Sequence, residues 1–286
     1  MSSPDRWNIL YRGPLSSCNY ACVYCPFAKT SNTVAELKED AARLDQFVDW
    51  VICQKKTIGV LITPWGEAMI HKSYQKALAR LSHASNVYRA SIQTNLSGKL
   101  DWLENCDLST IALWTTFHPS QTTISDFLKK CSELDRMNVT YSVGMVGLKE
   151  DLPKFQELRR SLPDSVYLWA NAYKDVTDYY ESSDIDAFEK VDPQFRVNTK
   201  NYPSMGKPCN GGYSTFSIDG NGDVFRCHFI KQKIGNIYSS TFGSFPKRMS
   251  CTNKTCDCHI GYIHMPELNQ DLVYGDGLLN RRVKDW

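Results

Sequence analysis

The sequence lacks the features of several large classes of protein. Its net charge is only +2 and it has no long run of lysine or arginine, so it lacks the electrostatic pattern of nucleic-acid-binding proteins. No apolar stretch approaches the ~18 residues that cross a membrane. No run of signal-peptide type occurs within residues 1–30. We therefore expect a cytoplasmic protein that binds neither nucleic acid nor a membrane.

Cysteine, by contrast, is abundant, with 11 in 286 residues. Disulfides are rare in the cytoplasm, so these thiols indicate metal or redox chemistry. Eight of them form two groups, which are Cys18, Cys22 and Cys25 near the N-terminus, and Cys209, Cys227, Cys251, Cys256 and Cys258 near the C-terminus. The other three, Cys53, Cys106 and Cys131, are predicted to be small buried hydrophobic residues.

Short apolar runs alternate with amphipathic segments over residues 1–173. We predict strands at 7–11, 58–63, 88–95, 110–117, 139–146 and 166–171. Helices are predicted at about 37–51, 71–83, 121–137 and 150–161. Parallel strands need long crossover connections, and such connections are right-handed. The alternation therefore predicts an α/β fold, a partial (β/α)6 TIM-like barrel.

The alternation of predicted strands and helices ends after residue 173. Residues 174–192, KDVTDYYESSDIDAFEKVD, carry seven acidic residues against two lysines and are predicted to be a surface connector. Residues 213–227, YSTFSIDGNGDVFRC, contain two β-prone runs around a Gly-Asn-Gly turn, which is typical of a hairpin. We therefore predict a barrel at 1–173, an acidic connector at 174–200 and a small C-terminal β-hairpin/helix module at 201–286.

The spacing of the first cysteine group is unusual for a metal site. Zinc sites pair cysteines as two close couples, and ferredoxin-type runs use a different spacing. Three thiolates can instead hold three irons of a [4Fe-4S] cube and leave the fourth iron open for a ligand that is not protein. The loop follows the first strand, at the carboxyl end where parallel sheets place their chemistry. A zinc knuckle or a chance group of buried thiols is the alternative.

The motif Cys18-x3-Cys22-x2-Cys25, with Tyr24 before the last cysteine, resembles the signature of radical S-adenosylmethionine (SAM) enzymes. The resemblance implies that the open iron binds the amino and carboxylate groups of SAM. One electron then cleaves SAM to a 5'-deoxyadenosyl radical, which abstracts hydrogen from an unactivated C–H bond. It also implies an electron donor of the flavodoxin or ferredoxin type.

Four further segments resemble SAM-contacting motifs of the same family. Gly66 and Glu67 lie in PWGEAM, where a tryptophan replaces the family's first glycine, and Asn95 ends QTN. Thr116 lies in TTFHP, and Gly147 lies in VGMVGLKE. The resemblance implies that all five, together with Tyr24 of the cysteine motif, contact the cofactor. Singly, each is better explained as a buried polar residue or a turn glycine, but their order and strand-end positions favour the family.

The C-terminal cysteines resemble the auxiliary-cluster modules called SPASM and Twitch. Five cysteines are too few for two clusters, so the resemblance implies one auxiliary [4Fe-4S] cluster, and two clusters in all. Its most Twitch-like ligands are Cys209, Cys227, Cys256 and Cys258. Cys251 is then a free thiol that can return hydrogen to a substrate radical. A zinc ribbon is one alternative, and exchange of Cys251 with Cys256 or Cys258 is another.

The segments NILYRGPLSSCNYACVYCPFAK and CDCHIGYIHM resemble the radical epimerases of neomycin-type aminoglycoside assembly. This implies inversion of a carbon in a small sugar-type substrate, with Cys251 as the hydrogen donor. The alternatives are a dehydrogenase of aminocyclitols that passes an electron to the auxiliary cluster, and modification of a ribosomal peptide. A non-enzymatic electron carrier is a fourth hypothesis.

Other conspicuous residues are given ordinary roles. Four histidines are predicted to be hydrogen-bonding core or surface residues, namely His118, His228, His259 and His264. Three tryptophans are predicted to pack in the core, namely Trp65, Trp114 and Trp169. Four acidic residues of the connector are predicted to form a solvated face, namely Asp178, Glu181, Asp184 and Asp186.

Overall fold

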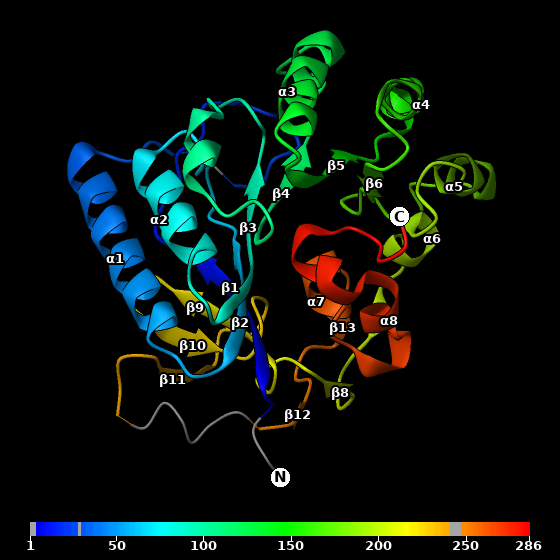
Figure 1. Cartoon of the computed structure of the whole chain (residues 1–286). Coiled ribbons are helices and arrows are strands. Elements are labelled where there is room, and N and C mark those ends of the chain that lie inside the picture. The colour runs from blue at the N-terminus through cyan, green and yellow to red at the C-terminus, as the bar shows by residue number, and fades with distance from the viewer. Residues whose placement is uncertain (1–3, 28–29, 241–246) are drawn as a thin grey trace.

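Figure 1 shows the computed structural model, which describes residues 4–27, 30–240 and 247–286. A nine-stranded sheet runs in the order β11-β10-β9-β1-β2-β3-β4-β5-β6. The strands from β9 to β6 are parallel, whereas β10 and β11 are antiparallel. Their bounds are β1 (Arg6–Arg12), β2 (Thr57–Ile62), β3 (Val87–Thr94), β4 (Ile111–Thr116), β5 (Thr140–Val146), β6 (Tyr167–Asn171), β9 (Thr215–Asp219), β10 (Asp223–Phe225) and β11 (Lys233–Asn236).

Helices connect the first six strands and form an outer arc around them (Figure 1). They are α1 (Val34–Ile52), α2 (Lys72–Ser82), the short 3-10 helix η1 (Asp101–Asn105), α3 (Ile124–Arg136), and η2 (Lys149–Asp151) followed by α4 (Leu152–Ser161). All six predicted strands and four predicted helices of the barrel are present within a few residues of their expected bounds. The partial (β/α)6 barrel is confirmed.

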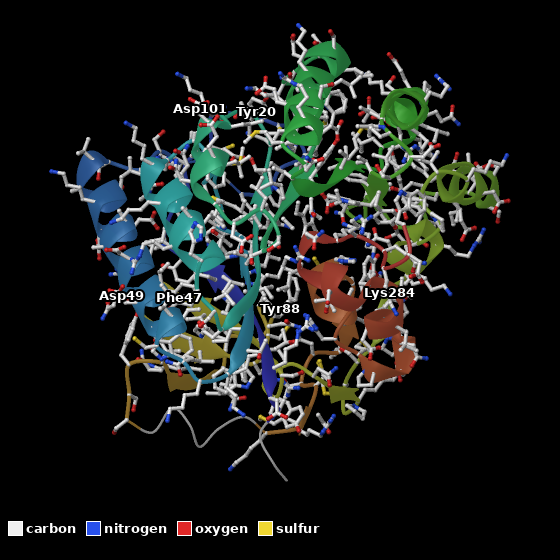
Figure 2. All side chains as sticks on the ribbon, viewed as in Figure 1. Tyr20, Phe47, Asp49, Tyr88, Asp101 and Lys284 are labelled. Atoms are coloured by element: carbon white, nitrogen blue, oxygen red, sulfur yellow. The ribbon has the colours of Figure 1, made fainter. Side chains whose placement is uncertain are left out.

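The outer helices cover the sheet because their apolar residues fall on one face. In α1, Phe47 points toward the sheet and is 1% exposed, whereas Asp49 points away and pairs with Arg80 of α2 (Figure 2). The helix starts at a capping box, in which Thr33 Oγ1 accepts from the Glu36 N–H over 3.3 Å and Glu36 accepts from the Thr33 N–H over 2.7 Å. Such a cap stabilises a helix by about 1 kcal/mol.

The C-terminal segment lies inside the curve of the strands, opposite the outer helices (Figure 1). It contains α7 (His259–Tyr262), η4 (Pro266–Leu268), α8 (Gln270–Tyr274) and η5 (Gly275–Asn280). Its side chains fill the space in front of the strands (Figure 2). One buried cluster joins the inner faces of the strands to this segment, and it includes Leu10, Leu61, Trp114, Tyr167, Trp169, Tyr262, Tyr274 and Leu279. The C-terminal segment of the chain therefore fills part of the interior of the barrel.

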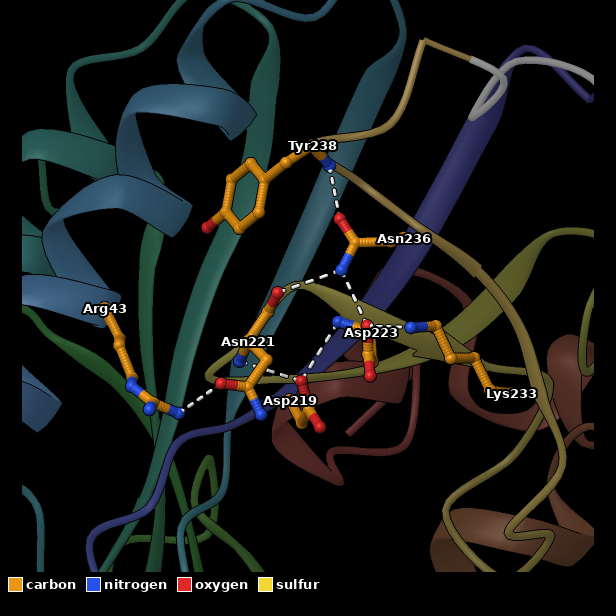
Figure 3. A network of polar contacts seen from close by, with 7 residues as sticks. All are labelled: Arg43, Asp219, Asn221, Asp223, Lys233, Asn236 and Tyr238. Carbon is orange, nitrogen blue, oxygen red and sulfur yellow. Dashed lines mark hydrogen bonds and ion pairs between the residues drawn. The ribbon is translucent and has the colours of Figure 1, made fainter.

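The hairpin β9–β10 extends the barrel sheet, because β9 pairs with β1 in parallel. Its turn is fastened to α1, where Arg43 donates to the side chain of Asn221 (Figure 3). Asp219 accepts from the Asn221 N–H over 2.8 Å and from the Asp223 N–H over 3.0 Å. Gly222 has φ +77°, and a Cβ atom there would lie 2.4 Å from the ring of Tyr238, so the turn requires glycine.

Two small sheets complete the C-terminal region. β7 (Tyr202–Pro203) pairs with β13 (Thr255–Cys256), and β8 (Pro208–Cys209) pairs with β12 (Met249–Ser250). The predicted division at residues 173 and 200 stays a prediction, and the nine-stranded sheet continues across it. Among the described residues, no helix has the length and apolar character needed to span a membrane.

The acidic connector forms α5 (Ser182–Glu189), followed by the single turn α6 (Phe195–Asn198). Asp178, Glu181 and Asp186 are exposed, as predicted for a solvated face. Asp186 pairs with Arg196, and Asp184 lies 3.6 Å from the ammonium group of Lys149. Four acidic side chains of the connector therefore lie at the surface or in surface ion pairs.

Candidate functional site

The first cysteine group lies on the loop that follows β1, at the carboxyl edge of the parallel strands. Two backbone hydrogen bonds fasten this loop to the segment after β2. The Trp65 N–H donates to Leu15 O over 3.1 Å, and the Glu67 N–H donates to Ser17 O over 3.1 Å. Between them, a Cβ atom at Gly66 would lie only 1.9 Å from the carbonyl oxygen of Ser17. The cysteine loop therefore packs directly on the backbone of the predicted Gly66 motif.

The buried carboxylate of Glu67 links several backbone segments at this edge of the sheet. Its side chain is 4% exposed, and its carboxylate accepts from the Asn95 N–H over 2.6 Å, from Thr94 Oγ1 over 2.7 Å and from the Met69 N–H over 3.0 Å. Burial raises the pKa of Glu67, and these donors oppose the shift. The carboxylate thus joins the ends of β2 and β3, and its contact with the amino group of SAM stays a prediction.

Asn95 reaches from the end of β3 to the cysteine loop. Its Nδ2 donates to Asn19 Oδ1 over 3.1 Å and lies 3.9 Å from Cys18 Sγ. The Tyr20 N–H donates to the same sulfur over 3.4 Å. Cys18 is therefore held from both sides, and Asn95 lies where the sequence predicts a site residue.

The segment after β4 contacts the other half of the loop. His118 Nδ1 shares a 2.9 Å hydrogen bond with Tyr24 Oη and lies 3.4 Å from Cys22 Sγ. Gln121 Oε1 accepts from the Ala21 N–H over 2.9 Å. Burial lowers the pKa of His118 to about 4, so its imidazole is neutral. His118 has the predicted hydrogen-bonding role, but sequence reasoning missed that its partner is the cysteine loop.

Two further predicted residues lie at neighbouring strand ends. Thr116 ends β4, is partly buried and pairs in register with Gly144. Gly147 follows β5, and its carbonyl oxygen accepts from Tyr180 Oη of the connector. A Cβ atom at Gly147 would lie 3.0 Å from that hydroxyl oxygen. The connector therefore covers Gly147, and the cofactor contacts of both residues stay predictions.

Arg12 lies between the two cysteine groups and was missed by sequence reasoning. It ends β1, and its guanidinium donates to Thr63 Oγ1 over 3.2 Å and to His228 Nε2 over 2.6 Å. It also lies 4.0 Å from the ring centre of Trp65. The Trp65 ring in turn lies 4.4 Å from Phe27 of the loop and 5.4 Å from His228. Burial lowers the pKa of Arg12 to about 10. A charged residue at the end of an apolar strand is the signal that could have identified it.

The second cysteine group surrounds a cavity of about 310 Å³. Its lining includes four of the five C-terminal cysteines, which are Cys209, Cys227, Cys251 and Cys256. The small sheets bring them together, because Cys209 lies on β8 and Cys256 on β13. Cys227 follows the hairpin strand β10, whereas Cys209 precedes the hairpin on the separate strand β8.

Cys258 does not line this cavity, although we predicted it as a ligand with Cys251 as the free thiol. Cys251 lines it with the other three, whereas Cys258 lies at the N-cap of α7, and the ligand set stays a prediction. Burial raises the pKa of Cys258, whereas Arg281 and Lys174 oppose the shift. Cys258 is also within electrostatic reach of Arg12. The ring of the next residue, His259, lies 5.5 Å from that of Trp114 in β4, so this turn of the chain faces the barrel.

The donor atoms of the two cysteine groups suit a cluster of iron and sulfur. In the second group, the Gly211 N–H donates to Cys209 Sγ over 3.3 Å and the Phe229 N–H donates to Cys227 Sγ over 3.5 Å. Burial raises the pKa of Cys227 to about 11, and a bound metal would favour its thiolate form. Four thiolates are the usual ligands of a [4Fe-4S] cluster. Among the described residues, no three Cys, His, Asp or Glu side chains lie at the distances of a site for one metal ion.

The remaining predictions concern ordinary packing. Trp114 and Trp169 are buried and contact one another edge to face at 5.6 Å, and His259 and His264 are buried. Cys131 is buried and Cys106 partly so, but Cys53 is exposed. The prediction was wrong for Cys53, because this residue is the C-cap of α1, where the helix leaves the sheet.

No protein-family model matches the sequence, and no curated protein is similar enough in sequence to count as a relative. Solved structures of radical SAM enzymes share the fold. Native anSMEcpe with bound AdoMet has a TM-score of 0.55 at 13% identity, over 82% of this chain and 80% of that one. The same enzyme with AdoMet and the Cp18Cys peptide gives 0.55 at 14%, over 83% and 79%. SuiB of Streptococcus suis, bound to S-adenosylmethionine, gives 0.52 at 15%, over 81% of this chain and 63% of SuiB. The chain therefore has the radical SAM fold.

Proposed function

We propose that the protein is a radical SAM enzyme with an auxiliary iron-sulfur cluster. The observation that carries the proposal is the position of Cys18, Cys22 and Cys25. These three thiols share one loop at the carboxyl edge of a partial barrel, and solved structures with this fold bind SAM. When bound, the cluster supplies one electron to SAM and so generates a 5'-deoxyadenosyl radical.

The protein's own residues position this cluster and its cofactor. Cys18, Cys22 and Cys25 would hold the cluster, and SAM would bind at the position that these three thiolates leave open. Asn95 and His118 orient the first two thiolates through the contacts described above. Gly66 allows the loop to approach the end of β2. Glu67 fastens the segment that follows β2 to the end of β3 beside the cysteine loop.

We expect Gly66→Ala to displace the cysteine loop, because the new Cβ atom cannot occupy a point 1.9 Å from Ser17 O. Reductive cleavage of SAM should fall roughly 10- to 100-fold, as is typical when a residue that supports metal ligands is changed. Gly98→Ala is the matched control, since its Cβ would lie 3.3 Å from its nearest neighbour. Wild-type rates of 5'-deoxyadenosine formation in Gly66→Ala would show that the loop does not depend on this contact.

We assign the auxiliary cluster to Cys209, Cys227, Cys251 and Cys256, because these four line one cavity. Cys258 is then the spare thiol. Its location near Arg12 supports a role in hydrogen transfer, in place of Cys251. An S–H bond can give its hydrogen atom to a carbon radical, which leaves a thiyl radical on Cys258. One electron from the reductant and one proton from water restore the thiol.

The reaction we propose is inversion of one carbon of a small sugar-type substrate. A free thiol on the barrel side of the module supports epimerisation, since the hydrogen has to return from a second direction. Peptide modification is the second candidate, because anSMEcpe has been solved with a bound peptide. A dehydrogenase that passes an electron to the auxiliary cluster is the third.

Turnover in heavy water separates these reactions. The anaerobically reconstituted enzyme, with SAM, dithionite and a panel of aminoglycosides and aminocyclitols, should give an epimer with one deuterium on carbon, because a thiol exchanges its hydrogen with solvent. A ketone without that label would indicate the dehydrogenase instead. If no 5'-deoxyadenosine forms either with or without these substrates, the radical SAM proposal itself fails.

A further inference from the structure

Arg226 is a buried cation at the auxiliary cavity, and no hypothesis above gives it a role. It directly follows β10 and is 1% exposed, yet its guanidinium has no carboxylate among its hydrogen-bond partners in the described chain. Nη1 and Nη2 donate to the carbonyl oxygens of Ser250 and Met249, the latter over 2.8 Å. Two of its nitrogens are thus occupied by β12, the strand that precedes Cys251.

The third nitrogen has no partner. Nε of Arg226 is buried without a hydrogen-bond acceptor among the described residues, and the side chain lines the cavity with the four cysteines. An unsatisfied buried donor of this kind destabilises the folded protein. An acceptor inside the cavity would satisfy it, and thiolate and sulfide sulfurs are such acceptors.

The backbone is built to admit this side chain. A Cβ atom at Gly212 would lie 2.9 Å from Cβ of Arg226, and one at Gly211 would lie 2.7 Å from its carbonyl oxygen. The side chain lines the same cavity as Cys209. The two glycines therefore leave room for the backbone and Cβ of Arg226 beside the proposed ligands.

We propose that Arg226 donates a hydrogen bond to the sulfur atoms of the auxiliary cluster and raises its reduction potential. The inference rests on the proposed auxiliary cluster and extends it. One-electron reduction makes a thiolate-bound cluster more negative, so a buried cation stabilises the reduced form. Hydrogen bonds to cluster sulfurs act in the same direction. The auxiliary cluster is then reduced at a higher potential than it would be without Arg226.

The test is a redox titration of the reconstituted holoenzyme with dithionite, followed by electron paramagnetic resonance. In Arg226→Gln, at a fixed potential near the midpoint, the ratio of reduced to oxidised auxiliary cluster should fall at least tenfold. For a one-electron couple this corresponds to a shift of about 59 mV. Arg226→Lys should keep most of the potential because it keeps the charge. The cluster of the Cys18 loop is an internal control and should not change.

Lys207→Met is the matched control on the same cavity. Lys207 also lines it, but this ammonium is 37% exposed and pairs with Glu267, so solvent screens its charge and the potential should stay near the wild-type value.

An unchanged auxiliary potential in Arg226→Gln would overturn the proposal. Loss of auxiliary iron from both Arg226 variants would also overturn it, since Arg226 would then build the site rather than tune it. If the wild-type protein contains only about four irons per chain, the proposal of an auxiliary cluster is itself contradicted.

Discussion

Replacement of Cys22 by alanine should abolish 5'-deoxyadenosine formation and lower the iron content from about eight to about four per chain. Cys22 is 5% exposed and contacts His118, so it lies at the most enclosed point of the loop. Without its thiolate, two cysteines remain for a cluster that needs three. Iron analysis after anaerobic reconstitution and chromatography of the SAM cleavage products are the measurements.

The control for this variant is Cys53→Ala, because Cys53 is exposed at the C-cap of α1 and belongs to neither cysteine group. It should keep both the full iron content and the cleavage activity. Cleavage of SAM by Cys22→Ala at the wild-type rate would contradict the assignment of the loop. The auxiliary cluster of Cys22→Ala should survive, since its cavity is lined by the second cysteine group.

Cys251 and Cys258 should respond in opposite ways to removal of the thiol. Cys251→Ala should lose the auxiliary cluster and keep about four irons, whereas Cys258→Ala should keep about eight. The reason is geometric, because Cys251 lines the cavity with three other thiols and Cys258 does not. Mössbauer spectra and iron analysis of the two variants give the answer without any substrate.

The same pair of variants also tests hydrogen transfer once a substrate is found. Cys258→Ala should form 5'-deoxyadenosine yet fail to invert the carbon, and it should incorporate no deuterium from heavy water at that centre. If Cys258→Ala bleaches the auxiliary cluster and Cys251→Ala does not, the ligand set predicted from the Twitch-like spacing is right and the assignment from the cavity is wrong.

The barrel could be predicted from sequence because its signals are local. Strand residues such as Ile58 and Val60 are buried in unbroken apolar runs, and α1 repeats its apolar residues at helical spacing. The loop of Cys18, Cys22 and Cys25 could be predicted for the same reason, since all three thiols lie within eight residues. The order of the elements then determines which strand ends lie beside it.

The presence of Cys251 and the absence of Cys258 in the lining of the C-terminal cavity could not be predicted, because a local change of chain direction decides it. In an extended strand, Cys256 and Cys258 would point to the same side and enter one site together. β13 ends at Cys256, however, and α7 begins at His259, so the chain turns between the two thiols. The spacing of two residues does not reveal that turn.

Contacts between distant parts of the chain were also hidden from the sequence. Arg12 is hydrogen-bonded to His228, although their residue numbers differ by 216. Leu279 of the C-terminal segment packs against the backbone of Gly59, in the middle of β2. Hydrophobic periodicity does not predict that the C-terminal segment enters the barrel. An apolar face indicates that residues are buried, but it does not indicate which segment of the chain packs against them.

The pairing of β1 with β9 has a consequence for how the chain is made. β1 leaves the ribosome before the other strands of the sheet, and β9 emerges only after the six strands of the barrel are complete. Until then, the backbone groups along one edge of β1 are unpaired, and an exposed edge can join another chain. Pairing over so long a sequence separation is also slow. The cysteine loop at the end of β1 thus reaches its final support only after β9 has been synthesised, about two hundred residues later.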